Sequence, residues 1–128
     1  MTIFDKIIAK EIPAQIEYED EFTLVFHDVN PQAPIHLLAI PKQSGIVSFQ
    51  EVNGDTMGHL IKAIQEVVKK MGLDKTGYRL VTNNGEDAGQ EVPHIHFHIL
   101  GGTKLGHVHY KDATKSNRSE ERRVGKEC

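Results

Sequence analysis

The stretch that decides the fold is residues 94–100, His-Ile-His-Phe-His-Ile-Leu, in which imidazole and apolar side chains alternate strictly. A period of two residues is typical of a half-buried β-strand, whose successive side chains point to opposite faces. We therefore expect Ile95, Phe97 and Ile99 to face a core and the three histidines to form a row on the other face. Alternate residues of a strand lie roughly 6.5–7 Å apart, so neighbouring imidazoles could contact one small substrate. The pattern predicts a strand that carries a site.

Similar patterns predict the other elements. Apolar residues at helical spacing predict helices at residues 3–10 and 55–71, with Thr2 and Asp55 as their N-caps. Alternating or compact apolar runs predict strands, and segments rich in Pro, Asn and Gly predict loops. The strands are expected at residues 16–18, 22–27, 36–40 and 78–82, and the loops at 28–34 and 83–90. This order predicts an α+β fold, with an antiparallel sheet of about five strands and helices on one face.

The chain of 128 residues is long enough for one domain with an ordinary core, which we place at residues 1–110. Apolar residues almost vanish from residue 111 onward, while charges of both signs crowd residues 118–127. A segment of this composition cannot bury a core face, so we expect residues 111–128 to form a disordered tail. An origin outside the natural protein stays an alternative for this tail.

The composition narrows the classes of partner and location. A net charge of −3 without a basic stripe argues against nucleic-acid binding. No apolar run approaches the length of a membrane span, and the first residues lack the apolar segment of a signal peptide. The single cysteine, Cys128, rules out an internal disulfide and a cysteine-based zinc site. We expect a cytoplasmic protein without membrane or nucleic-acid partners.

Three interpretations of the histidine row compete. In the first, the imidazoles are surface residues without a task, and strict alternation makes this a poor explanation. In the second, they bind a metal ion that His36 or Asp87 completes, although adjacent alternating residues rarely supply three ligands to one tetrahedral ion. In the third, one neutral imidazole attacks phosphorus while another contacts the phosphate, and backbone N–H groups of residues 89–91 assist. The residue types alone leave the second and the third open.

The pattern His-φ-His-φ-His-φ-φ at residues 94–100, where φ is apolar, resembles the histidine triad (HIT) family. The likeness continues in Ile3-Phe4 with Ile7-Ile8, in Asn83 with Gly89-Gln90, and in residues 26–36, Phe-His-Asp-Val-Asn-Pro-Gln-Ala-Pro-Ile-His. These segments are similar to the Hint branch of the family. The resemblance covers roughly the first 105 residues.

The resemblance implies a role for each matching position. His96 would be the nucleophile that forms a nucleotidyl-histidine with the α-phosphate, and His98 would contact the phosphate and the leaving group. His94 and His36 would hold the ring of the nucleophile through hydrogen bonds. The implied substrate-binding positions are Asn83, Gly89, Gln90 and Glu91 at the phosphate, Asp28 and Val29 at the ribose and base, and Ile3, Phe4, Ile7 and Phe26 in an apolar purine slot. On periodicity alone, the four apolar residues fit an ordinary core better.

The activity that the resemblance implies is hydrolysis of purine nucleoside 5′-phosphoramidates to a nucleoside monophosphate and an amine, with no cofactor and no metal. It also implies a homodimer across which the sheet continues. Two alternatives stay open: a dinucleoside polyphosphate hydrolase of the same family, and a nucleotide-binding interaction module whose catalysis is incidental. Glu91, where many relatives have serine, and the chain after Leu105 depart from the family pattern. Both departures bear on which leaving group is accepted.

Overall fold

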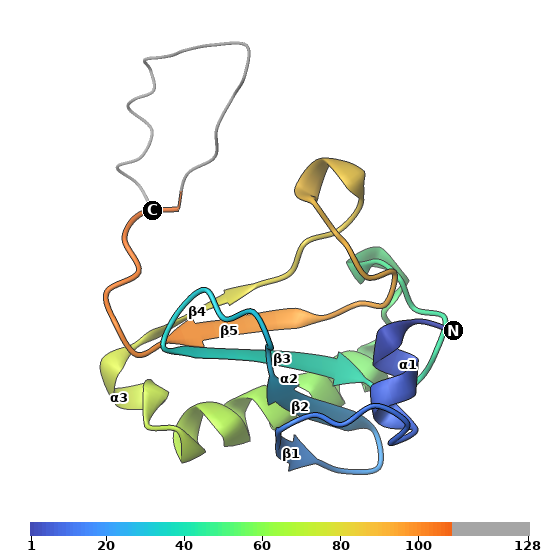
Figure 1. Cartoon of the computed structure of the whole chain (residues 1–128), viewed down its shortest axis with the longest axis horizontal. Helices are drawn as coiled ribbons and strands as arrows, with labels where there is room; N and C mark the ends of the chain where they lie inside the picture. Colours follow the sequence, from blue (N-terminus) through green and yellow to red (C-terminus); the bar gives the residue numbers. More distant parts are fainter. Residues whose placement is uncertain (109–128) are drawn as a thin grey trace.

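The computed structural model describes residues 1–108, so the expected tail at residues 111–128 lies outside the described part of the chain. Five strands form one sheet in the order β1-β2-β3-β5-β4, and all neighbours are antiparallel (Figure 1). The strands are β1 (Ile16–Glu19), β2 (Thr23–His27), β3 (Ile35–Pro41), β4 (Tyr78–Val81) and β5 (Phe97–Gly101). The predicted α+β fold with an antiparallel sheet of about five strands is confirmed.

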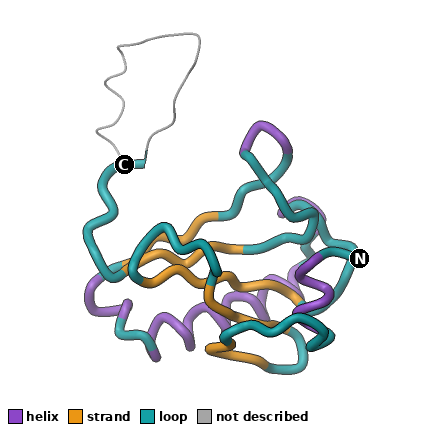
Figure 2. The backbone as a smooth tube through the Cα atoms, viewed as in Figure 1, coloured by secondary structure: helices purple, strands orange, loops and turns teal. Residues whose placement is uncertain are grey.

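The helical segments lie before and between these strands (Figure 2). They are α1 (Ile3–Ile8), η1 (Phe49–Glu51), α2 (Gly54–Lys70), α3 (Leu73–Thr76) and η2 (Glu86–Ala88). Thr2 caps α1 as predicted, because its hydroxyl accepts a hydrogen bond from the backbone N–H of Asp5 at 3.1 Å. The N-cap of α2 is Asn53 rather than Asp55, since the side chain of Asn53 accepts from the N–H of Thr56 at 2.8 Å. Several polar residues precede the apolar stripe, and the stripe alone does not choose between them.

The sheet has apolar clusters on both faces. Alternate residues of β3 point to opposite sides, so Leu37 and Ala39 join one cluster while Leu38 and Ile40 join the other. The first cluster is covered by α2 and α3, and the second is covered by α1 through Phe4 and Ile7. Both predicted helices were expected on one face of the sheet. The helix α2 covers one face, whereas α1 packs against the opposite face.

The histidine strand begins at Phe97 and not at His94, which corrects the predicted strand at residues 94–100. The β3–β5 pairing runs from Ile35 opposite Gly101 to Ala39 opposite Phe97, and continuing it would place Ile40 opposite His96 and Pro41 opposite Ile95. Proline has no N–H to donate to a ladder. The N–H of Ile95 instead donates to the carbonyl of Ile46 at 2.9 Å. His94 and His96 therefore lie in an extended segment just before the strand.

None of the helices within residues 1–108 combines the length and the apolar character that crossing a lipid bilayer requires.

Thr23, the first residue of β2, carries a buried hydroxyl with no hydrogen-bond partner among the described residues. An unsatisfied buried polar group costs roughly 1–3 kcal/mol. We expect Thr23→Val, which keeps the shape of the side chain, to raise the free energy of unfolding by about 1 kcal/mol in urea titrations. Thr23→Ser is the control: it keeps the hydroxyl, loses a methyl group and should lower stability. A less stable Thr23→Val would show that the hydroxyl is bonded in solution.

Candidate active site

His36 and His98 meet because β3 and β5 are neighbours in the sheet. Leu38 lies opposite His98 and His36 lies opposite Leu100, so the two histidines are diagonal neighbours on one face of the sheet. The Nε2 of His36 is 2.9 Å from the Nδ1 of His98, and their ring centroids are 5.1 Å apart. Two imidazoles that are 62 positions apart in the chain thus form one hydrogen-bonded pair.

His96 lies beside this pair, just before β5, and is 7% exposed. Its ring centroid is 5.1 Å from that of His98. The Nδ1 of His96 is 2.8 Å from the backbone carbonyl of His94. A carbonyl only accepts hydrogen bonds, so this Nδ1 carries the proton. In the neutral ring the lone pair is then on Nε2, which is the nitrogen that can attack an electrophile.

His94 holds the ring of His96 through a hydrogen bond, as expected, but it does so with its backbone carbonyl, whereas the expectation that His36 holds this ring is wrong. The Nε2 of His94 donates to the carbonyl of Pro41 at 2.9 Å, and the residue is 1% exposed. The chain bends here, because the N–H of His94 donates to the carbonyl of Val92 at 2.8 Å. His94 thus orients the ring of His96 through its backbone, and the ring of His36 binds His98 rather than His96.

Asp5 is a neighbour of this site that sequence reasoning did not assign to it. Its Oδ1 accepts a hydrogen bond from the hydroxyl of Ser44 at 2.6 Å and lies 3.7 Å from the Nδ1 of His94. Its Oδ2 accepts from the backbone N–H of Thr2 at 2.9 Å. The Ser44 and Thr2 hydrogen bonds lower the pKa of the Asp5 carboxyl. The carboxylate therefore joins the start of α1 to the buried histidine, and no local sequence signal indicates this contact.

Burial keeps the site histidines neutral. Desolvation, with smaller contributions from the charges of His96 and His36, lowers the pKa of His98 to about 4. Desolvation is also the main cause that lowers the pKa of His96 and that of His36. A charged imidazole is disfavoured away from water, and a second imidazolium nearby repels it. At neutral pH all three rings are therefore uncharged.

The four residues expected in an apolar purine slot separate into two groups. Phe4, Ile7 and Phe26 are buried together in the cluster under α1, whereas Ile3 is 49% exposed. The ring of Phe4 makes edge contacts with Phe26 at 5.7 Å and with His96 at 5.1 Å between centroids. Phe4 therefore contacts His96 from α1, while most of its own surface is already buried against protein.

Asp28 and Val29 follow β2 at the edge of the histidine face. The Oδ2 of Asp28 is 3.5 Å from the Nε2 of His36, and its Oδ1 accepts from the N–H of Asn30 at 2.8 Å. Asp28 thus forms a local turn and also faces the histidine pair. Val29 is 88% exposed. The structure brings Asp28 to the histidines, and it leaves Val29 on the surface.

The side chain of Gln90 is used inside its own loop. Its Nε2 donates to the carbonyls of Val47 at 2.9 Å and Val92 at 3.1 Å, and its Oε1 accepts from the N–H of Gly85 at 2.9 Å. These bonds attach the loop before the histidines to the segment after β3. Gln90 therefore shapes the loop rather than presenting a free amide.

The backbone of this loop differs from the expectation that Gly89 and Gln90 offer N–H groups to a phosphate. The N–H of Gly89 donates to the carbonyl of Glu86 at 3.0 Å, and that of Gln90 donates to the carbonyl of Gly85 at 3.1 Å. Gly89 has a φ of 77°, a left-handed conformation that glycine adopts without strain and that closes the η2 turn. Among the described residues, no carbonyl accepts from the N–H of Glu91, whose side chain is exposed.

Asn83 and Asn84 have different surroundings, which their sequence does not distinguish. The Oδ1 of Asn84 accepts a hydrogen bond from the N–H of Phe49 at 2.7 Å. This bond connects the loop after β4 to η1. Asn83 is half-buried and has no hydrogen bond to any group in residues 1–108. Its amide remains available for a ligand.

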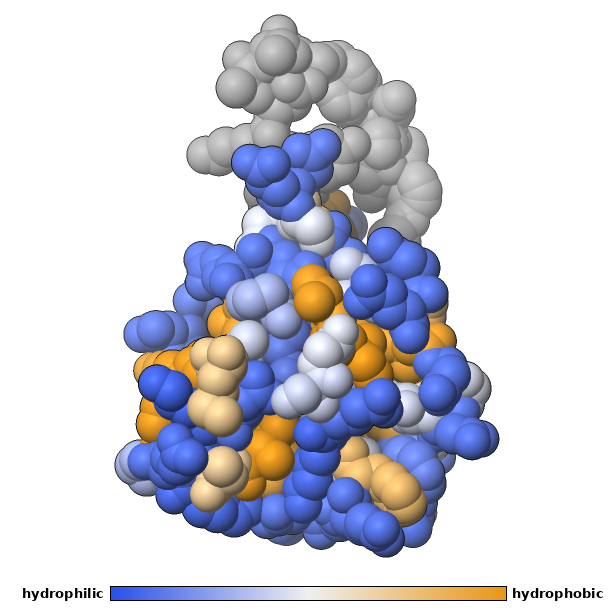
Figure 3. All heavy atoms as spheres, turned by 90° about the vertical axis from the view of Figure 1, so that its right-hand side faces the viewer, coloured by the Kyte–Doolittle hydropathy of each residue, from blue (hydrophilic) through white to orange (hydrophobic). Residues whose placement is uncertain are grey.

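Figure 3 shows the α1 side of the molecule, where hydrophobic surface appears in separate patches among hydrophilic side chains.

Asp28, His36 and His98 are the one group in residues 1–108 with the spacing of a metal site, since their ligand atoms lie within 4.8 Å of one another. Asp87 is not part of it. However, the N–H of Gln32 donates to the Nδ1 of His36 at 3.0 Å. A metal-binding histidine uses one nitrogen for the metal and donates a hydrogen bond from the other. In His36 the Nδ1 accepts a hydrogen bond, so the proton of the neutral ring is on Nε2, the nitrogen that would have to bind the metal. Asp28, His36 and His98, as arranged, therefore do not fit a metal ion.

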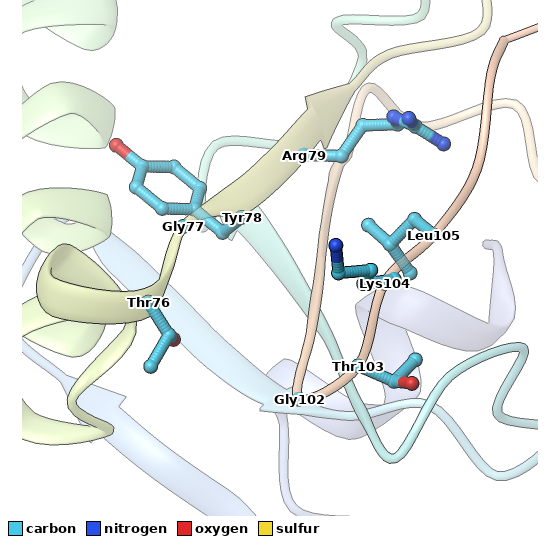
Figure 4. Close-up of a pocket in the computed structure, with 8 residues that line it drawn as sticks. All are labelled: Thr76, Gly77, Tyr78, Arg79, Gly102, Thr103, Lys104 and Leu105. Carbon is cyan, nitrogen blue, oxygen red and sulfur yellow. The ribbon is translucent and has the colours of Figure 1, made fainter.

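A groove of about 520 Å³ lies away from these residues, beside the edge strand β4. It is lined by Thr76 to Arg79 and by Gly102 to Leu105 (Figure 4). Figure 4 shows that one lining segment runs from the end of α3 into the start of β4 and that the other is the chain after β5. None of the expected site residues lines this groove.

Comparisons with known proteins agree with this arrangement. The HIT domain model matches residues 9–105. An uncharacterized HIT-like protein of Helicobacter pylori is 49% identical over 104 residues, which cover 81% of this chain and 99% of that protein. A protein of Zea mays named 14 kDa zinc-binding protein is 47% identical over 108 residues, covering 81% of this chain and 84% of its own. The crystal structure of a HIT family hydrolase from Legionella pneumophila has a TM-score of 0.77 at 41% identity, covering 83% and 96% of the two chains.

The fold, the paired histidines and these relatives define a protein of the histidine triad hydrolase class. The chain belongs to the HIT domain family.

Proposed function

We propose that the protein hydrolyses purine nucleoside 5′-phosphoramidates, releasing a nucleoside monophosphate and an amine. The observation that carries this proposal is the hydrogen bond between the Nδ1 of His96 and the carbonyl of His94. It leaves the neutral His96 ring with its lone pair on Nε2, next to His98 and without a partner among the described residues. A neutral imidazole with a free nitrogen is a competent nucleophile towards phosphorus.

The reaction takes two displacements at phosphorus. The Nε2 of His96 attacks the α-phosphorus; a phosphorus–nitrogen bond to His96 forms as the bond to the leaving amine breaks, and the amine takes up a proton from water. A water molecule then attacks the same phosphorus and gives up a proton to the solvent, the bond to His96 breaks, and the nucleoside monophosphate is released with His96 neutral again. Two steps at one atom allow the nucleoside to stay bound while the leaving group departs.

The remaining site residues bind the substrate in this proposal. Asp28 holds the ribose hydroxyls, Asn83 and the N–H of Glu91 contact the phosphate, and Gly89 and Gln90 shape that loop. The support is the free amide of Asn83, the free N–H of Glu91 and the position of Asp28 beside His36. Val29 and the apolar residues of α1 and β2, namely Ile3, Phe4, Ile7 and Phe26, are proposed to border the base.

The experiment that tests the proposal is to mix the protein with adenosine 5′-phosphoramidate, quench at early times and locate adducts by peptide mass spectrometry. We expect a nucleotidyl group on His96, and no such adduct in His96→Gly. Hydrolysis of a dinucleoside polyphosphate at a higher kcat/KM than the phosphoramidate would move the assignment to that substrate class. An adduct on another histidine would overturn the role of His96.

The acid limb of the pH profile should lie below the usual range of histidine. His96 attacks only when it is unprotonated, and burial lowers its pKa from the usual value of about 6.5. A lowered pKa delays protonation to more acidic solution, so the midpoint of the acid limb of kcat/KM should lie below about 6.5. Steady-state rates with the phosphoramidate between pH 4 and 9 measure this. A midpoint above 6.5 would contradict a neutral, buried nucleophile.

We further propose that two copies pair through β4 and continue the sheet across a homodimer. β4 is an edge strand, so one side of its backbone has no ladder partner within the chain. Tyr78 and Leu80 of this strand are 44% and 45% exposed. An unpaired edge with exposed apolar side chains is the type of surface that a second strand covers.

Leu80→Lys should convert this dimer to a monomer, because it places two ammonium groups near each other at the paired edges. Size-exclusion chromatography with light scattering measures the mass. Phe22→Lys is the matched control, since Phe22 is equally exposed at 45% but lies before β2 at the other side of the sheet. A wild-type protein that is monomeric at micromolar concentration would overturn the pairing.

A further inference from the structure

The backbone N–H of Gln32 determines where His36 carries its proton. This N–H is 3.0 Å from the Nδ1 of His36, and an amide nitrogen in the backbone can only donate. The Nδ1 of His36 therefore holds a lone pair. His36 is 4% exposed and burial lowers its pKa, so the ring is neutral at neutral pH and has a single proton. That proton is on Nε2.

The proton on His36 in turn determines the tautomer of His98. The Nε2 of His36 lies 2.9 Å from the Nδ1 of His98, whereas the Oδ2 of Asp28 is farther away at 3.5 Å. The Nε2–H therefore donates mainly to His98, whose Nδ1 must accept. Since the neutral His98 ring also has one proton, this proton is on its Nε2. No group among the described residues accepts a hydrogen bond from that atom.

We infer that Gln32 is a positioning residue whose backbone N–H makes His98 a fixed hydrogen-bond donor at the phosphoryl site. His96 and His98 then have opposite tautomers side by side: the Nε2 of His96 has a lone pair, and the Nε2 of His98 has a hydrogen. Each tautomer is set by a backbone group, the carbonyl of His94 and the N–H of Gln32. The role of this donor rests on the proposed function, because its acceptor is an oxygen or the leaving atom of the bound phosphoryl group.

The same hydrogen bond withholds His36 from metal ions. A divalent cation between Asp28, His36 and His98 needs the lone pair of the His36 Nε2, and its proton would then have to move to Nδ1. The N–H of Gln32 points at Nδ1, so two donors would face each other. The arrangement thus favours a donor to a phosphoryl group over a metal ligand.

The first test needs no substrate. Long-range ¹H–¹⁵N spectra of the full chain, labelled at histidine nitrogen and recorded at neutral pH, distinguish the two neutral tautomers of each ring. We expect a proton on Nε2 in His36 and in His98, and on Nδ1 in His96. A proton on the Nδ1 of His36 would overturn the inference whatever the protein hydrolyses. The expected tautomers in a protein that does not turn over the phosphoramidate would instead overturn only the proposed function.

The second test removes the donor and keeps a matched control. Gln32→Pro has no backbone N–H, whereas Gln32→Ala keeps it and loses only the side chain, whose Nε2 donates to the carbonyl of Asn30 at 3.2 Å. We expect Gln32→Ala to keep the tautomers of His36 and His98, and its kcat serves as the reference for Gln32→Pro. Gln32→Pro should shift the His36 proton towards Nδ1, lower kcat about 10- to 100-fold, and be inhibited by Zn²⁺ at lower concentrations than Gln32→Ala. Equal kcat, tautomers and Zn²⁺ sensitivity in the two variants would refute the role of the N–H.

A third pair of variants covers the case in which Gln32→Pro does not fold. In His36→Gln, the side-chain amide can still donate to the Nδ1 of His98, whereas in His36→Leu nothing donates to it. We expect the Nε2–H tautomer of His98 to persist in His36→Gln and to become a mixture in His36→Leu. The same His98 tautomer in both variants would contradict the proton chain from Gln32.

Discussion

Replacing His96 with glycine is expected to lower kcat for adenosine phosphoramidate hydrolysis by on the order of 10⁴-fold or more, as loss of a catalytic nucleophile does in other hydrolases. The expected cause is the missing Nε2 lone pair beside His98, not a change of fold. His96 is in the extended segment before β5, and its side chain makes one hydrogen bond, to the carbonyl of His94. Steady-state kinetics and circular dichroism of the same preparation separate the two causes.

Two further measurements make the His96 result specific. His27→Ala is the control, since His27 pairs with Glu17 at 2.7 Å on the outer part of the sheet and has no proposed role in catalysis. Added imidazole should partly restore turnover in His96→Gly, because the glycine leaves space for a free imidazole to attack phosphorus in place of the side chain. Wild-type kcat in His96→Gly would end the covalent mechanism.

Truncation of Phe4 should have the largest effect on stability among the site residues. Phe4 is 5% exposed and connects α1 to both the apolar cluster and the ring of His96. We expect Phe4→Ala to lower the free energy of unfolding by about 3 kcal/mol, in the range found when a buried phenylalanine is removed. Urea unfolding measures this change. Phe4→Leu fills most of the volume of the phenylalanine side chain, so its loss of stability should be less than half of that caused by Phe4→Ala.

The same variants also test whether α1 affects catalysis. If Phe4 positions His96, Phe4→Leu should lower kcat for the phosphoramidate even where the protein is fully folded, because a leucine cannot make the edge contact with the imidazole. Lys6→Ala is the control on the same helix, since Lys6 is exposed and has no proposed contact with the substrate. A kcat for Phe4→Leu equal to that of the control would assign Phe4 to the core alone.

The loop at residues 83–91 shows which features of the site could be predicted from the sequence and which could not. Its residues were expected to offer N–H groups to a phosphate, yet the N–H groups of Gly89 and Gln90 donate within the loop. The glycine pattern indicates a tight turn correctly, but a turn closes by using its own N–H groups. Which donor remains free, here that of Glu91, depends on the turn geometry, and residue types alone do not encode it.

The local periodicity of apolar residues was sufficient to predict the strands of the sheet and the face on which the histidines lie. The alternation in residues 94–100 predicts that Ile95, Phe97 and Ile99 share one cluster, and the structure places them together under α2. The apolar stripe at residues 55–71 likewise predicts the helix that covers them. Both patterns depend only on the backbone repeat of the element that carries them, which a short segment of sequence contains in full.

The tertiary structure alone decided which groups meet across the site. The register between β3 and β5 brings His36 to His98, and the position of α1 brings Asp5 within 3.7 Å of His94. Pro41 ends the pairing that would have made His94 and His96 part of the strand. The proton positions on the imidazoles follow from a backbone N–H at Gln32 and a backbone carbonyl at His94. Every residue has such groups, so no side-chain pattern marks these two, and only the folded chain selects them.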